Sequence, residues 1–93
     1  MDAPKASAAL RIRNKKGLHA RASAKFVETA ARFQCEVTVR KDGNEVSGRS
    51  IMGLMMLGAS MGTTVEITAA GADAKDAVAA LSRLIEAKFH EDA

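Results

Sequence analysis

The spacing of apolar residues changes several times along this chain, and the order of those changes restricts the folds open to it. Leu10 and Ile12 alternate with polar or small residues, as do Val37 and Val39, and this period of two indicates half-buried strands. Elsewhere apolar residues recur three and four positions apart, which indicates helices. The pattern predicts strands at 8–13, 36–41, 45–48 and 63–69, and helices at about 19–32, 51–57 and 73–88.

The residues between these segments supply matching turn and cap signals. Asp42 and Gly43, followed by Asn44, are typical of a tight hairpin between antiparallel strands. Ser50 can cap the short helix that follows, and Asp73 can cap the last one. These signals mark where the second strand of the hairpin and the last two helices begin.

Strands that alternate in polarity leave one face of a sheet wet and the other covered. The order strand–helix–strand–strand–helix–strand–helix therefore predicts an α+β fold, an open-faced sandwich with three helices on one face of a four-stranded, mostly antiparallel sheet. A chain of 93 residues is too short for two cores. We expect residues 1–7 to form a flexible tail and residues 8–90 to form one domain.

The composition argues against several classes of protein. No segment reaches the roughly 18 apolar residues needed to cross a membrane, and the N-terminus lacks the pattern of a secretory signal. Cys35 has no partner for an internal disulfide, which fits a reducing compartment, and we expect it to pack as a small half-buried hydrophobe. These features predict a cytoplasmic protein without membrane insertion.

The candidate reactive group is His19, where the turn at Gly17 leads into an alanine-rich helix. Free backbone N–H groups and the helix dipole favour an anion there and disfavour an imidazolium, so a neutral, nucleophilic imidazole could attack phosphorus. Arg21 could hold phosphoryl oxygens with its forked N–H donors, aided by the looser charges of Lys15, Lys16 and Lys25. His19 could instead be an exposed helix cap with no chemical role, although His is not a favoured N-cap residue. A helix that begins at Ser23 would avoid that difficulty but would lose the geometry of the anion site.

Three segments resemble the HPr family, the histidine-containing phosphocarriers of the bacterial phosphoenolpyruvate-dependent phosphotransferase system. Residues 17–27 resemble its active-site segment, residues 50–58 its regulatory serine segment, and residues 62–67 its last strand. The resemblance covers about residues 8–88. One residue departs from the family pattern, because Ala22 stands where the family usually has proline after the motif arginine.

The resemblance implies a function. Enzyme I, charged by phosphoenolpyruvate, would phosphorylate Nδ1 of His19, Arg21 would stabilise the phosphoryl group, and an enzyme II A-type domain would accept it in a sugar-uptake or regulatory relay. Such a protein is a stoichiometric carrier rather than an enzyme and needs no cofactor or metal. We expect it to act as a monomer.

The second segment implies regulation and docking. Ser50 matches a serine that a dedicated HPr kinase/phosphatase modifies in some members, where the added charge hinders phosphorylation of the histidine. The helix after Ser50 is apolar nearly all round, so one face must remain exposed. The family comparison places Leu54 and Leu57 inward. It places the expected partner surface at Gly17, Ala20, Ile51, Met52 and Met55.

Other classes of function fit less well. RNA-recognition motifs share a similar element order, but they stack bases on aromatic residues of the central strands. This chain has no Trp or Tyr, and its three Phe lie on or near predicted helices, so we expect no nucleic-acid partner. His19, Cys35 and His90 lack the spacing of metal ligands. The sequence leaves open an adaptor role, in which Gly17 and Arg21 would have no chemical task.

Overall fold

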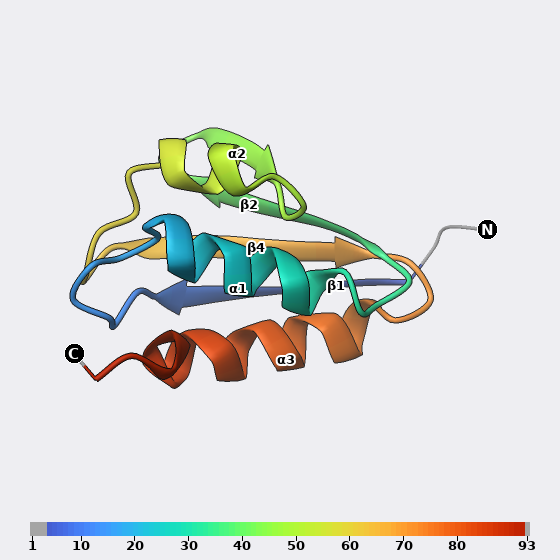
Figure 1. The fold of residues 1–93 in the computed structure, drawn as a ribbon. Helices are drawn as coiled ribbons and strands as arrows, with labels where there is room; N and C mark the ends of the chain where they lie inside the picture. Colours follow the sequence, from blue (N-terminus) through green and yellow to red (C-terminus); the bar gives the residue numbers. More distant parts are fainter. Residues whose placement is uncertain (1–3, 93) are drawn as a thin grey trace.

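The structure, a computed structural model that describes residues 4–92, contains the predicted strands and helices in the predicted order (Figure 1). The elements are β1 (Lys5–Arg11), α1 (Ala20–Ala30), β2 (Glu36–Lys41), β3 (Asn44–Ser47), α2 (Ile51–Met56), β4 (Thr64–Ala70), α3 (Ala74–Glu86) and a short 3-10 turn, η1 (Lys88–His90).

The strands form one sheet in the order β1-β4-β2-β3, and all three pairings are antiparallel. The three helices cover one face, with α1 and α3 side by side along the strands and α2 beside β3 (Figure 1). Val37 and Val39 of β2 and Val65 and Ile67 of β4 are buried beneath the helices, as their alternation predicts. The expected open-faced α+β sandwich is confirmed.

The N-terminal boundary differs from the prediction. β1 begins at Lys5, which pairs with Ala70 of β4, so residues 5–7 belong to the sheet rather than to a flexible tail. The start of this strand is difficult to predict from sequence, because Ala6 and Ala8 are small and produce only a weak alternation of apolar and polar residues. Residues 1–3 of the predicted tail lie outside the described residues.

The face that α1 buries differs from the apolar stripe that helical spacing predicts, namely Ala20, Ala24, Val27, Ala30 and Ala31. Ala20 and Ala31 are exposed, and Ala24 and Val27 are half-buried. The buried residues of the helix are Ala22, Ser23, Phe26 and Ala30. A helix rich in alanine has no strong stripe of its own, so the rotation that buries the large Phe26 side chain is favoured.

The hairpin and the caps follow the sequence signals. Asp42 and Gly43 form the two-residue turn between β2 and β3, both with positive φ (51° and 83°), as a primed hairpin turn requires. Ser50 caps α2 through its Oγ, which accepts from the Gly53 N–H at 2.9 Å. Asp73 precedes α3, but its carboxylate accepts from the Gln34 N–H instead of capping the helix. None of the helices within residues 4–92 has the length and hydropathy that a membrane span requires.

Candidate functional site

His19 is the residue from which α1 begins. Its backbone is extended (φ −74°, ψ 179°), and its carbonyl accepts the first helical hydrogen bond, from the Ser23 N–H at 2.9 Å. The helix therefore starts at Ala20, and the alternative start at Ser23 is wrong. His19 is therefore the N-cap residue of α1. The first-turn N–H groups that follow such a residue have no intrahelical partner, which makes the start of a helix a favourable place for an anion.

The loop before His19 is held by backbone contacts. The Leu18 N–H donates to the Ala59 carbonyl at 2.9 Å, and Ser23 Oγ donates back to the Leu18 carbonyl at 3.1 Å. Gly17 has a left-handed backbone (φ 62°) and is buried against Ala59. Gly17 was expected on the partner surface, but its burial gives it a conformational role instead. Ala20 is exposed.

Glu91, close to the C-terminus, contacts the candidate nucleophile directly. One carboxylate oxygen lies 2.5 Å from His19 Nε2, and the other accepts from Asn14 Nδ2 at 3.0 Å. Asn14 Nδ2 also donates to the Gly17 carbonyl at 2.8 Å, so two acceptors fix the orientation of this buried amide. The carboxylate is thus tied both to the ring and to the loop that carries it.

This contact determines which ring nitrogen is free. Burial raises the pKa of Glu91, but hydrogen bonds from His19 and Asn14 and the charges of His19 and Lys25 outweigh it, so the pKa lies below its ordinary value of 4.5. An ionised carboxylate only accepts, so the shared hydrogen belongs to Nε2. In neutral His19 the lone pair is then on Nδ1.

An unusual backbone turn carries Glu91 to the site. Lys88, Phe89 and His90 all have left-handed angles (φ 57°, 55° and 60°), which costs about 1–2 kcal/mol per residue for side chains of this kind. Phe89 is fully buried, and Lys25 Nζ of α1 donates to its carbonyl at 2.5 Å. These contacts hold the turn despite its strain. The domain therefore extends beyond the expected end at residue 90.

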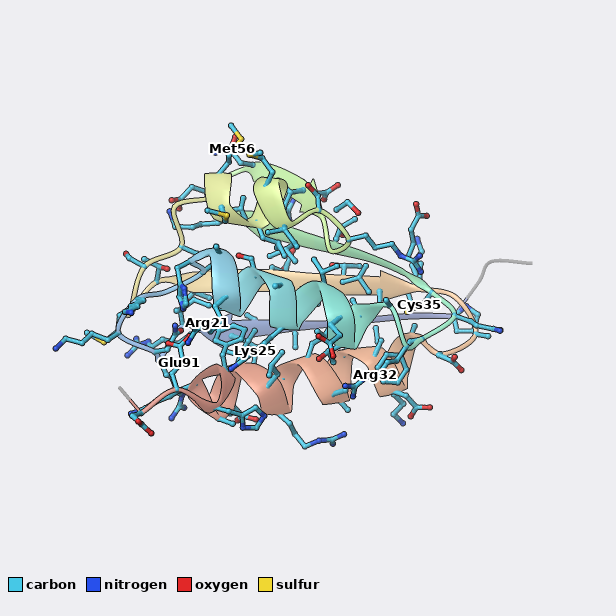
Figure 2. The ribbon with its side chains drawn as sticks, in the orientation of Figure 1. Arg21, Lys25, Arg32, Cys35, Met56 and Glu91 are labelled. Atoms are coloured by element: carbon cyan, nitrogen blue, oxygen red, sulfur yellow. The ribbon has the colours of Figure 1, made fainter. Side chains whose placement is uncertain are left out.

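An open hollow of about 690 Å³ surrounds His19. Figure 2 shows Arg21, Lys25 and Glu91 at this end of the molecule, where α1 begins and α3 ends. The Arg21 side chain is exposed and forms no hydrogen bond or ion pair with any residue in 4–92. The charged or titratable neighbours of His19 that line the hollow are Lys15, Lys16, Arg21, Lys25, His90, Glu91 and Asp92.

The structure thus brings together His19, Arg21 and the predicted lysines, and it adds two residues that sequence analysis missed. Asn14 lies in the turn that ends at Gly17, and Glu91 lies just beyond the predicted domain of residues 8–90. The one sequence signal for Glu91 was Phe89, a large apolar residue in an otherwise polar terminus, which indicates that the tail is anchored.

The other predicted residues lie on α2 and the adjacent loops. Ser50 is half-buried at the start of α2. Leu54 and Leu57 are buried, whereas Ile51, Met52 and Met55 are exposed by 41%, 70% and 43%. The predicted inward and outward faces of this helix are confirmed.

A larger groove, of about 920 Å³, lies between α1 and α3. Of the residues that line the hollow at His19, it shares only Lys25 and His90. Cys35 is half-buried. Burial and the nearby charge of Asp73 raise the pKa of its thiol, and the charge of Arg49 opposes this shift only in part.

Phe26 and Phe89 are buried in the core, so they offer no surface for stacking bases. In residues 4–92 no group of three or more His, Cys, Asp or Glu could hold a metal ion.

Known proteins are similar to this chain in sequence and in fold. The family described as the PTS HPr component phosphorylation site matches residues 6–87. The phosphocarrier protein HPr of Neisseria meningitidis is 52% identical over 82 residues, covering 88% of this chain and 92% of that protein. The phosphocarrier protein NPr of Shewanella violacea is 41% identical over 80 residues, covering 86% and 88%.

A solved HPr structure from Thermoanaerobacter tengcongensis superposes with a TM-score of 0.90 at 45% identity, covering 95% of this chain and 99% of that one. The fold, the family match across most of the chain and the curated relatives agree. This chain belongs to the HPr family of phosphotransferase-system phosphocarrier proteins.

Proposed function

We propose that this protein accepts a phosphoryl group from phosphorylated enzyme I on Nδ1 of His19 and passes it to an enzyme II A-type domain. It acts stoichiometrically, as a monomer in the cytoplasm, and the phosphohistidine is a transient intermediate. The relay serves either sugar uptake or regulation. The names HPr and NPr among the relatives are compatible with this proposal.

The observation that carries the proposal is the position of the His19 ring. Its Nε2 contacts the Glu91 carboxylate, which leaves the lone pair of neutral His19 on Nδ1, and His19 is the residue from which α1 begins. A neutral imidazole nitrogen at the start of a helix can form a bond to phosphorus. The free N–H groups there can donate hydrogen bonds that stabilise the negative charge on the phosphoryl oxygens.

Arg21 is proposed to bind the phosphoryl oxygens. It lies two residues after His19, is exposed, and lines the same hollow. A guanidinium with no partner in the described residues can form two parallel hydrogen bonds to a phosphoryl group. The charges of Lys15 and Lys16 add a weaker attraction for the same anion.

The test is transfer of label from phosphoenolpyruvate through enzyme I. Wild type incorporates acid-labile, alkali-stable label in the peptide that contains His19, and H19A incorporates none while its circular dichroism is unchanged. R21M slows labelling by roughly tenfold or more, because charge-assisted hydrogen bonds to the phosphoryl group are lost. R32M is the matched control, since Arg32 lies beyond the opposite end of α1 (Figure 2). A folded wild type that takes no label from competent enzyme I refutes the relay.

Regulation through Ser50 is a second part of the proposal. A phosphate there would add about two negative charges beside the exposed residues of α2 and repel an acidic partner. An HPr kinase/phosphatase with ATP should label wild type but not S50A. S50D should slow labelling of His19 without unfolding the domain. Equal labelling of wild type and S50A by the kinase excludes this site.

The exposed face of α2, formed by Ile51, Met52 and Met55, is proposed as the docking surface, together with Ala20. Flexible, polarisable methionines can adapt to several partners. M52D should weaken binding of enzyme I without loss of stability. M61D makes the same change at an exposed methionine outside this surface and should bind normally. Unchanged transfer kinetics in M52D would remove α2 from the docking surface.

A further inference from the structure

Glu91, close to the C-terminus, contacts the candidate nucleophile His19, and its role depends on the proposed function of that histidine. We propose that Glu91 is a positioning residue for phosphoryl transfer, which selects Nδ1 of His19 as the nucleophile and stabilises the cationic ring of the phosphorylated carrier. His19 and Glu91 then act as a pair, in which the carboxylate works through the imidazole.

The geometry supports the first half of this role. One oxygen of the Glu91 carboxylate contacts Nε2 of His19. The other oxygen accepts a hydrogen bond from Nδ2 of Asn14, a residue that is completely buried. The His19 and Glu91 side chains are only 27% and 16% exposed, so water competes weakly for the contact. An acceptor fixed on Nε2 retains the hydrogen there, holds the ring plane and leaves Nδ1 as the basic nitrogen.

The charge change during transfer supports the second half. As the Nδ1 lone pair forms a bond to phosphorus, the bond between phosphorus and its donor breaks, and its electron pair leaves with the donor. No proton moves at Nε2. The His19 ring becomes a cation bearing the phosphoryl group on Nδ1 and hydrogen on Nε2, directly against the carboxylate. A carboxylate stabilises an imidazolium formed in this way.

The same contact acts when the phosphoryl group leaves. A protonated ring is the better leaving group, because it departs as neutral imidazole. Glu91 favours that protonated form of the ring. The neighbouring cations oppose it, and these are Lys15, Lys16, Arg21 and Lys25. His90 and Asp92 also line the hollow. Among these groups in residues 4–92, only Glu91 forms a hydrogen bond or ion pair with the His19 ring.

The strained C-terminal turn explains how Glu91 reaches this position. Three consecutive left-handed residues are unfavourable unless the surroundings hold them. Buried Phe89 and the bond from Lys25 to its carbonyl provide that restraint, and the next residue but one is Glu91. The turn therefore serves to present a carboxylate to a histidine 72 positions earlier in the chain.

The experiment compares wild type, E91A and E91Q, with E86A as the control that removes one exposed carboxylate from the same terminal region. Long-range proton–nitrogen NMR reports the His19 tautomer, and label from enzyme I reports the rate. Wild type and E86A should show hydrogen on Nε2. E91A should show mixed tautomers and label roughly ten- to a hundredfold more slowly, with E91Q between them.

The pH dependence of phosphohistidine hydrolysis gives a readout that a structural role would not move. The lability of the phosphorylated protein should fall off at a lower pH in E91A than in wild type, because the protonated ring has lost its carboxylate. E91Q keeps the side-chain shape and should shift in the same direction. Wild-type tautomer, rate and hydrolysis profile in folded E91A and E91Q overturn the role of Glu91. Failure of wild type itself to accept label refutes the relay instead.

Discussion

Gly17 lies against the backbone of Ala59, and this contact fixes the loop that delivers His19 to the start of α1. A Cβ on Gly17 would overlap the Ala59 carbonyl oxygen and would lie 2.9 Å from the Ser60 Cα. The same Ala59 carbonyl accepts from the Leu18 N–H, so the loop has no room to move away without breaking that bond. The reactive loop is therefore built against the segment that follows α2.

Gly17→Ala is expected to destabilise the fold by more than about 2 kcal/mol. An alanine with left-handed angles costs about 1–2 kcal/mol, and the overlap with the backbone adds to that cost. Gly58→Ala is the matched control, because Gly58 has nearly the same φ (66°) but open space around its Cα. Urea unfolding measures both free energies. Equal losses in the two variants would show that the contact with Ala59 contributes nothing.

Ser50→Ala should lower the free energy of unfolding by about 1 kcal/mol, because the Gly53 N–H loses its cap acceptor. Ser50→Asp supplies another acceptor and should recover most of that stability. Ser60→Ala, at an exposed serine, should change stability little. If S50D is as unstable as S50A in urea unfolding, its effect on labelling of His19 cannot be ascribed to charge alone.

Lys25→Met should loosen the C-terminal turn, because the Phe89 carbonyl loses its charged donor. We expect a loss of about 1 kcal/mol, since Lys25 remains partly exposed. Hydrogen exchange should accelerate at the His90 and Glu91 amides, which bond within the turn. Lys75→Met, at the exposed start of α3, should leave those rates unchanged. Unaltered exchange in K25M would mean that Phe89 burial alone holds the turn.

The contribution of Glu91 to stability should depend on pH. Its pKa in the folded protein is lowered from the ordinary value of 4.5, so its contribution is fully present above that value and is lost as the pH falls through the lowered pKa. Wild type should therefore be more stable than E91Q at pH 7, and the difference should shrink in acid. Urea unfolding at a series of pH values measures it. A difference between the two proteins that does not change with pH contradicts the assignment.

The sequence by itself determined the element order and the open sheet, and it indicated His19 as the candidate nucleophile. Period-of-two alternation, the Asp42-Gly43 turn and the serine cap are local signals, each decided by a few adjacent residues. The position of His19 near an alanine-rich helix is also a local signal, although only the structure decides between a helix start at Ala20 and one at Ser23. Features that depend on a few adjacent residues can therefore be predicted without knowledge of the tertiary structure.

Only the tertiary structure decided the surroundings of the His19 ring. Glu91 is 72 positions from His19, and Asn14 is 77 positions from Glu91, so no periodicity relates them. Their contact depends on the antiparallel packing of α1 and α3 and on the left-handed turn at Lys88–His90. Non-glycine residues adopt such a turn only when long-range contacts, here the burial of Phe89, outweigh its strain. The rotation of α1 and the early start of β1 were hidden for the same reason, because alanine-rich segments carry little pattern until neighbouring elements select one face.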